Sequence, residues 1–364
     1  VKKKSHSEVC TRCATLCKTI YDRRTVKIKD EPIRGQAVLL YVQKRRFFCK
    51  NCQKPFTEHV RDVKKGNRVT DRYRRYVFWA CDNFGDLSSV RKEARCSASF
   101  LYKTYYAHLE HQARCNRRAS WPKIIGVDEH SFKRNKTYGH TEFATVFVDY
   151  NKRRLVEVVE GKQAGILKSA LEEIPHPERV KHVILDLADS YKSFARDYFP
   201  NAQLVADKFH VLRLLNPAIN KYRKLSFGES RTLPVRKLLL ANGERLDYFT
   251  RLALMKGLEE HPALREVYLF KEGLHRLYRC KGLNNAAICL TKFTDAMANA
   301  SLPEIHSLRK TLMKWRHEIL AYFETKLTNA RTEGFNNKAK LIKRRAYGYR
   351  SFKNYRLRLL NACC

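Results

Sequence analysis

The sequence lacks the features that would tie the protein to a membrane or to an export route. No apolar run approaches the roughly 20 residues that a helix needs to cross a bilayer. The basic residues 2–4 are followed by the polar residues 5–8, so we expect no signal peptide. Internal repeats and low-complexity tracts are missing as well. These absences predict a cytoplasmic protein without a membrane partner.

Acidic residues are scarce. The chain has 364 residues, with 36 Asp and Glu against 74 Lys and Arg, which gives a formal net charge of +38. A compact chain with this charge repels itself unless a polyanion binds it, and nucleic acid is the usual polyanion. The alternative is a basic protein that associates with ribosomes or with a membrane surface. Hydrophobic residues make up 44% of the chain, enough for a buried core, and the length predicts roughly two or three domains.

Five of the twelve cysteines are concentrated near the N-terminus. Four of them form two C-x-x-C pairs, Cys10 with Cys13 and Cys49 with Cys52, and Cys17 fits neither pair. Two such pairs can supply the four thiolates of a tetrahedral structural zinc site. In a chain without an export signal this spacing favours metal over disulfides. The alternative is a set of unliganded core cysteines.

The segment between the two cysteine pairs has the pattern of a hairpin. Residues 25–29 and 36–48 read as strands, and the polar residues 30–35 read as the turn. Together with the cysteine pairs, this layout predicts a zinc ribbon over residues 1–60.

A basic stretch at residues 61–75 leads into a helical pattern that opens at Thr70 and Asp71. Two short helices follow, at 87–94 and 97–105, with a tight turn between them. We therefore predict a helix-turn-helix in residues 61–120, with a linker from residue 108, although an ordinary helical hairpin has the same pattern. The second helix would lie in the major groove and bring four residues to DNA: Ser97, Ser99, Lys103 and Thr104.

From residue 121 the pattern is that of an α/β domain. The predicted strands are 124–127, 141–149, 154–160, 180–186 and 203–206, and the predicted helices are 164–174, 190–198 and a long one from about residue 208. This order is typical of a mixed sheet. Residues 217–325 have helical spacing without strand-like alternation, which predicts an α-helical insertion between residues 121–216 and the final helical part, 326–364.

Three acids stand at comparable points of this layout. Asp128 and Asp186 each follow an apolar run of strand length, and Glu333 precedes the last helical region. A single Asp at such a point is more commonly a turn or helix cap. Three of them in a basic α/β chain suggest a shared site, because Mg²⁺ prefers oxygen ligands and its charge relieves their repulsion. We interpret them as ligands for magnesium or manganese that cleave DNA by a two-metal mechanism.

Other residues compete for roles near these acids. Asp189 could cap the helix after the fourth strand. Asp207 also follows a predicted strand and is the second choice for a metal or auxiliary role. His210 either contacts the scissile phosphate or simply packs.

Three stretches carry a resemblance to a known family. They read GVDE at 126–129, ADKFH at 206–210, and RTEGFNNK at 331–338 followed by KRRAYGY at 343–349. They resemble the DDE transposases of the bacterial insertion-sequence group ISL3, over nearly the whole chain. The resemblance implies a ribonuclease H-like catalytic fold interrupted by the helical insertion, with the catalytic triad on Asp128, Asp186 and Glu333.

The function that the resemblance implies is DNA transposition. Such an enzyme binds terminal inverted repeats, cleaves strands with Mg²⁺, and joins the freed 3′-OH ends to target DNA. We expect a homo-oligomer on double-stranded DNA, near the bacterial nucleoid. Five basic residues would hold the backbone: Lys133, Arg134, Lys343, Arg344 and Arg345. The alternatives are a zinc-dependent DNA-binding regulator without catalysis, and a serine or tyrosine recombinase with a covalent intermediate.

Overall fold

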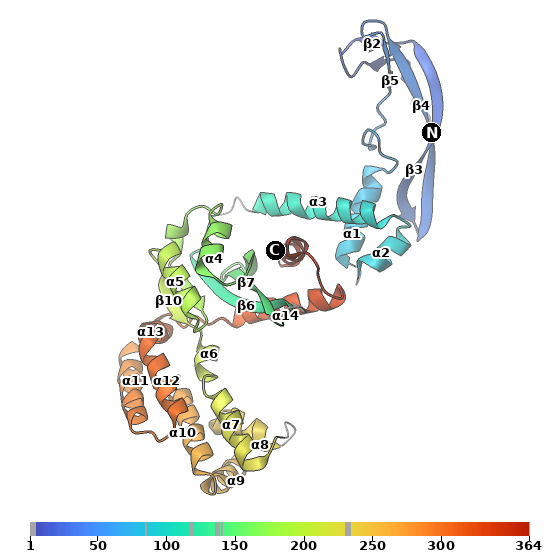
Figure 1. Cartoon of the computed structure of the whole chain (residues 1–364). Coiled ribbons are helices and arrows are strands. Elements are labelled where there is room, and N and C mark those ends of the chain that lie inside the picture. Colours follow the sequence, from blue (N-terminus) through green and yellow to red (C-terminus); the bar gives the residue numbers. More distant parts are fainter. Residues whose placement is uncertain are drawn as a thin grey trace. The chain divides into compact units, whose positions relative to one another are not determined.

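The computed structural model describes residues 5–83, 86–116, 120–134, 139, 141–229 and 234–363 (Figure 1). The chain divides into two compact units. The first unit consists of Val1–Arg114 with Lys343–Gly348, and the second of Cys115–Ile342 with Tyr349–Cys364.

The first unit begins with two small antiparallel sheets. Strands β1 (Glu8–Val9) and β2 (Leu16–Cys17) pair with each other, and β3 (Ile20–Ile33), β4 (Gln36–Cys49) and β5 (Lys54–Thr57) form the second sheet. The β3–β4 hairpin is longer than predicted, because the turn is confined to Arg34 and Gly35, both with positive φ. The predicted turn at 30–35 is therefore mostly strand.

Three helices complete the first unit: α1 (Asp71–Asn83), α2 (Leu87–Glu93) and α3 (Ala98–Asn116). The predicted start of α1 is confirmed, since the backbone N–H of Tyr73 donates to the hydroxyl of Thr70 at 3.1 Å. Helix α3 is far longer than the predicted short helix. Its buried stripe continues through Leu109 and Ala113, so the predicted linker from residue 108 begins inside a helix.

The second unit contains a five-stranded mixed sheet in the order β10-β9-β6-β7-β8. Strands β6 (Ile124–Arg134), β7 (Thr141–Asp149) and β8 (Arg154–Glu160) are antiparallel neighbours, and β9 (His182–Leu185) and β10 (Gln203–Ala206) run parallel to β6. The mixed sheet predicted from the pattern is confirmed. Strand β6 is longer than predicted because it pairs with β7 as far as Arg134. Asp128 therefore lies inside a strand and not at its exit.

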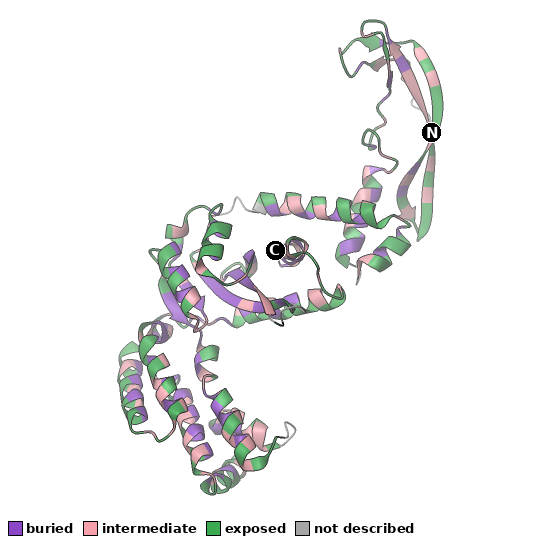
Figure 2. Ribbon diagram, viewed as in Figure 1, coloured by how far each residue is buried: buried purple, intermediate pink, exposed green. Residues whose placement is uncertain are grey.

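Both faces of this sheet are covered. Val127, Val183 and Leu185 face the main core with α4 (Ala164–Leu171) and α5 (Asp189–Tyr198), and Figure 2 shows much of β6 as buried. The other face lies against α13 (Arg316–Thr325), α14 (Ala330–Arg345) and α15 (Phe352–Ala362). A Cβ at Gly126 would lie 2.3 Å from Thr332 Oγ1, so the glycine permits the close approach of α14.

Between residues 217 and 325 the described part of the chain forms helices joined by turns, and none of it lies in a strand. Its elements are α7 (Asn216–Phe227), α8 (Pro234–Leu240), the 3₁₀ turn η2 (Gly243–Arg245), α9 (Tyr248–Glu259), α10 (Pro262–Leu277), α11 (Leu283–Ala298), α12 (Pro303–Lys314) and α13. One further 3₁₀ turn, η1 (Pro177–Arg179), precedes β9.

Two predicted long helices are divided. The helix expected from residue 208 is α6 (Lys208–Leu212) followed by α7, which has a proline in its first turn. The last helical region is α14 and α15, separated at Tyr347 and Gly348, which have φ of 51° and 98°. Asp189 is the first helical residue of α5 and not its cap, and its carboxylate accepts a hydrogen bond from Lys314 Nζ.

Candidate active site and zinc centre

Three aspartates lie side by side at the sheet: Asp128 on β6, and Asp186 and Asp207 directly after the parallel strands β9 and β10. Gly126 pairs with Ile184, so two residues further along β6 and β9 stand Asp128 and Asp186. Leu185 pairs with Ala206, so Asp186 and Asp207 are the residues that directly follow β9 and β10. Equivalent positions on parallel strands point to the same face of a sheet. Here this is the face against α14.

His210 joins two of these carboxylates. Its Nδ1 lies 2.9 Å from Asp186 Oδ1 and 3.0 Å from Asp207 Oδ2. Possible ligand atoms of the three residues all lie within 4.8 Å of one another. Burial lowers the pKa of His210, but the hydrogen bonds and charges of the two carboxylates outweigh it and raise the pKa to about 10. A positive charge is thus stabilised between the two aspartates.

Asp186 and Asp207 differ in how their oxygens are used. Both oxygens of Asp207 accept hydrogen bonds, from His210 Nδ1 and, at 2.9 Å, from the backbone N–H of Asn329. Asp207 therefore fastens the start of α14 to the end of β10. Oδ1 of Asp186 is buried and lies 2.9 Å from His210 Nδ1, the same nitrogen that hydrogen-bonds to Asp207. Because one N–H cannot point at both carboxylates, Asp186 keeps lone pairs that a cation can take.

Asp128 is buried, with 9% of its surface exposed. Its Oδ1 accepts the N–H of Glu129 at 2.7 Å, and its Oδ2 accepts Asn336 Nδ2 at 2.8 Å. Burial and the neighbouring Asp186 raise the pKa of Asp128 to about 8. Two carboxylates that oppose each other's ionisation in this way form a strong site for a cation.

Glu333 is exposed on the first turn of α14. It lines a cavity of about 190 Å³, and Asp128, Asp207, His210, Asn336 and Lys340 line the same cavity. Glu333 thus lines the same cavity as Asp128 and Asp207. It does not belong to the tight group of Asp186, Asp207 and His210.

Several residues that hold this site together were not predicted. Asn336 links Asp128 to His130, whose Nδ1 lies 3.1 Å from Asn336 Oδ1, and the other ring nitrogen of His130 contacts the Tyr355 hydroxyl. Asn329 donates from Nδ2 to the carbonyl of Val127 at 2.9 Å. The available signal was the spacing of Glu333 and Asn336, which places them on one face of a helix.

The donor set fits a hard divalent cation. Carboxylate oxygens dominate it, and the pKa of Asp128 is raised by its burial and then by the neighbouring Asp186, whose charge a cation would balance.

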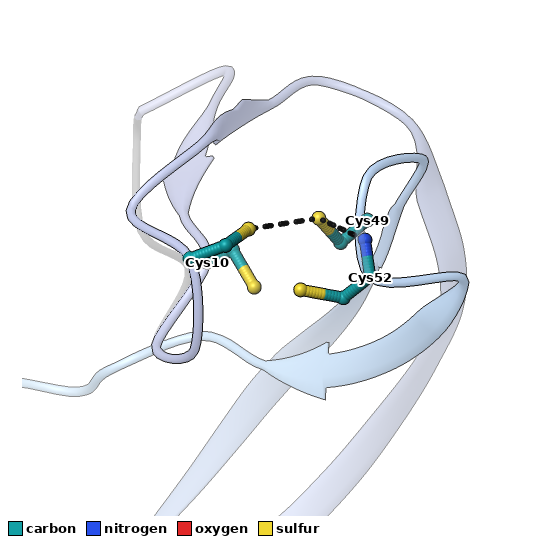
Figure 3. A group of neighbouring side chains, drawn as sticks. Cys10, Cys49 and Cys52 are labelled. Carbon is teal, nitrogen blue, oxygen red and sulfur yellow. Dashed lines mark hydrogen bonds between the residues drawn. The ribbon is translucent and has the colours of Figure 1, made fainter.

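The four predicted zinc ligands form a second centre, in the first unit. Ligand atoms of Cys10, Cys13, Cys49 and Cys52 lie within 4.8 Å of one another. Figure 3 shows the sulfurs of Cys10, Cys49 and Cys52 turned towards one another. The backbone N–H of Cys52 points at Cys49 Sγ at 3.4 Å, which favours a thiolate there. These contacts fit a tetrahedral sulfur site for zinc.

The pKa values of two of these cysteines are shifted in opposite directions by their neighbours. Hydrogen bonds with Thr15 lower the pKa of Cys13 to about 5, and the neighbouring Cys13 raises that of Cys52 to about 12. Cys17 is buried beside the four but is not one of them, and its thiol donates to the carbonyl of Thr15.

Comparison with known proteins assigns these features to a family. A model for DDE transposases of the ISL3 group, described as "Transposase", matches residues 125–359. The chain belongs to the ISL3 family of DDE transposases. A second model, described as "zinc-finger of transposase IS204/IS1001/IS1096/IS1165", matches residues 6–52. The predicted resemblance is therefore confirmed, and with it a DNA-cleaving and DNA-joining enzyme that acts on DNA and uses divalent metal.

Named transposases share its sequence. The transposase for insertion sequence element IS1001 of Bordetella parapertussis is 26% identical over 364 residues, covering 96% of this chain and 87% of the relative. The transposase for IS1557 of Mycobacterium tuberculosis is 25% identical over 258 residues, covering 62% of this chain and 57% of the relative.

The residues predicted to contact DNA differ in their surroundings. Ser99 and Lys103 of the transposase are exposed on α3, whereas Ser97 caps that helix by accepting the N–H of Phe100 at 3.2 Å. Thr104 is half-buried. Lys133 is exposed on β6, and the side chain of Arg134 lies outside the described part. On α14, Arg344 and Arg345 are exposed and Lys343 is half-buried.

Among the described residues, no helix is long and apolar enough to span a membrane.

Proposed function

We propose that this transposase binds the terminal inverted repeats of an insertion sequence, cleaves DNA at the element ends, and joins the 3′-OH ends to target DNA. The catalytic acids are Asp128, Asp186 and Glu333. One observation carries this assignment. Asp128 and Asp186 occupy equivalent positions on adjacent parallel strands, and Glu333 on α14 lines the cavity that Asp128 also lines.

The catalytic domain has a ribonuclease H-like fold in this proposal. Its support is the strand order, in which three antiparallel strands are followed by two strands that add in parallel beside the first. The helical segment from α7 to α12 stands between the second and third acids in the sequence, as an insertion into that fold.

Asp128, Asp186 and Glu333 would hold magnesium or manganese. When bound, the metal activates the attacking water or 3′-hydroxyl and stabilises the leaving oxygen. Asp186 offers its carboxylate beside His210, and Asn336 keeps the Asp128 carboxylate in one orientation. His210 and Lys340 supply positive charge at the same cavity, where a phosphate would lie. Asp207 positions His210 and α14, because both of its oxygens are already engaged.

The DNA-binding part of the proposal rests on the first unit. Helices α2 and α3 form a helix-turn-helix, with exposed Ser99 and Lys103 on its second helix. Lys133, Arg344 and Arg345 hold the DNA backbone. Because transposition brings two ends together, we infer a homo-oligomer on DNA in the bacterial cytoplasm.

The test uses a labelled duplex that carries the end of the element. The 364-residue chain is incubated with it in Mg²⁺, Mn²⁺ or EDTA, with unlabelled target DNA present. We expect metal-dependent release of a 3′-OH end and its transfer to the target. Binding without cleavage in any metal would support the regulator instead. A covalent protein–DNA band would replace the metal mechanism with that of a serine or tyrosine recombinase.

A further inference from the structure

One face of the β3–β4 hairpin carries a row of exposed polar side chains. In the antiparallel register Arg23 pairs with Arg45, Thr25 with Gln43, and Lys27 with Tyr41. Paired residues share one face of the ribbon. Arg23, Thr25, Lys27 and Tyr41 are exposed, and Figure 2 shows exposed positions along both strands. We call this the outer face.

The opposite face of the hairpin explains why the outer face stays open. Its pairs include Val26 with Val42 and Ile28 with Leu40. Ile28 and Val42 are buried against Val63. This inner face supplies the apolar contacts of the hairpin. On the outer face Arg45 is half-buried and pairs with Glu58, whereas Arg23, Thr25 and Lys27 stay exposed.

The hairpin is strongly basic. Residues 20–49 contain eight Lys and Arg and three Asp and Glu. Two of the acids are already engaged, Asp22 with Arg46 and Asp30 with Thr70 and Arg72. Strand β4 contains no acidic residue at all. The charge of the hairpin therefore favours a polyanion.

The hairpin is also anchored to the helices that are proposed to bind DNA. Lys29 Nζ donates to the carbonyl of Arg95, in the turn between α2 and α3, and lies 5.5 Å from the ring centre of Tyr73. The Asp30 contacts fasten the same end of the hairpin to α1. A DNA contact made by the hairpin would thus be fixed relative to α1, α2 and α3.

We propose that the outer face of the β3–β4 hairpin enters the major groove of the DNA at the element end, as a contact separate from that of α3. A two-stranded ribbon fits the major groove, which is about 12 Å wide. Arg23 and Lys27 bind phosphates, and Thr25, Gln43 and Tyr41 present hydroxyl and amide groups to the groove. The inference rests on the proposed function, since it requires binding to the element end.

The hairpin supplies its own matched control. Arg23→Gln with Lys27→Gln removes two charges from the outer face. Arg24→Gln with Lys44→Gln removes the same charge from the opposite face of the same strands, because Arg24 pairs with Lys44. Zinc content of each variant reports that the ribbon has folded. Both variants of the full-length chain are compared for affinity, salt dependence and protection of guanine N7 on a duplex with the element end.

We expect the outer-face variant to bind roughly 10- to 100-fold more weakly at about 0.1 M salt, with a salt slope lower by about two, because two phosphate contacts are lost. It should also lose N7 protection over a few base pairs that the inner-face variant still protects. Equal affinity and equal protection in both variants, or an equal loss in both, would overturn the inference. If the wild type cleaves the same duplex, the proposed function holds whichever result the variants give. If the wild type does not bind the duplex, the proposed function itself is contradicted.

Discussion

Asn336 Nδ2 donates a hydrogen bond of 2.8 Å to Asp128 Oδ2, across 208 residues of sequence. The same Asn336 contacts His130, and His130 contacts Tyr355. A proposed metal ligand on β6 is therefore held by a polar chain that runs through α14 to α15.

We expect Asn336→Ala to lower DNA cleavage by about 10- to 100-fold, the usual cost of losing a residue that orients a metal ligand. The metal concentration for half-maximal cleavage should rise, because Asp128 loses the donor that holds it. Asn337→Ala alters the exposed neighbour and serves as the control. An Asn336→Ala protein with normal metal dependence would show that this hydrogen bond does not position Asp128.

Gly126 gives a prediction about packing. Gly126→Ala places a methyl group 2.3 Å from Thr332 Oγ1 and 2.8 Å from Asn329 Oδ1, so α14 must move away from the sheet. Overpacking of this kind typically costs about 1–3 kcal/mol. We expect a lower midpoint of thermal unfolding and reduced cleavage.

Gly165→Ala is the matched control for Gly126, because a Cβ at Gly165 on α4 meets nothing within 4 Å. Its unfolding midpoint should stay the same or rise. Equal midpoints for the two variants would contradict the close approach of α14 to β6.

Asp186 and Asp207 should respond in different ways to the loss of charge. Asp186→Asn should abolish cleavage while changing stability little, since the relief of its repulsion with Asp128 offsets the lost charge contact with His210. Asp207→Ala should destabilise the protein by about 1–3 kcal/mol, because the N–H of Asn329 loses its buried acceptor. Thermal unfolding and cleavage measured on both variants test this division. If Asp186→Asn destabilised the protein and Asp207→Ala did not, Asp186 would be the structural residue of the two.

Substitution of single cysteines should distinguish Cys17 from the four predicted zinc ligands. Cys13→Ser and Cys49→Ser should each lose the bound zinc, since a tetrahedral structural site needs all four thiolates. Cys17→Ser should keep it, because Cys17 donates to a backbone carbonyl and is outside the group of four. The measurement is the zinc content per chain of each purified variant, which shows whether a substituted cysteine is a ligand. Zinc loss from Cys17→Ser with retention in Cys13→Ser would contradict the ligand set.

The sequence predicted the parts of the fold that depend on local patterns. Strands 141–149, 154–160 and 203–206 coincide with β7, β8 and β10, because alternation and flanking turn residues mark them. The sequence also indicated that Asp128 and Asp186 could share a site, because each follows an apolar run of strand length.

What could not be predicted depends on partners far away in the sequence. The extension of β6 past Asp128 comes from pairing with β7, and residues 129–134 show no strand pattern of their own. The length of α3 was hidden because only Leu109 and Ala113 continue its buried stripe among polar residues. The roles of Asn329 and Asn336 appear only when α14 lies against the sheet, since an amide side chain alone indicates no partner.

The most direct test of the account is cleavage of the labelled element end by Glu333→Gln. Glu259→Gln, an exposed change of the same kind on α9, is the matched control. The account predicts that Glu333→Gln binds the duplex normally and loses cleavage by at least about a hundredfold, because a proposed metal ligand has gone. Glu259→Gln should cleave as the wild type does. Normal cleavage by Glu333→Gln would contradict the assignment of the catalytic acids.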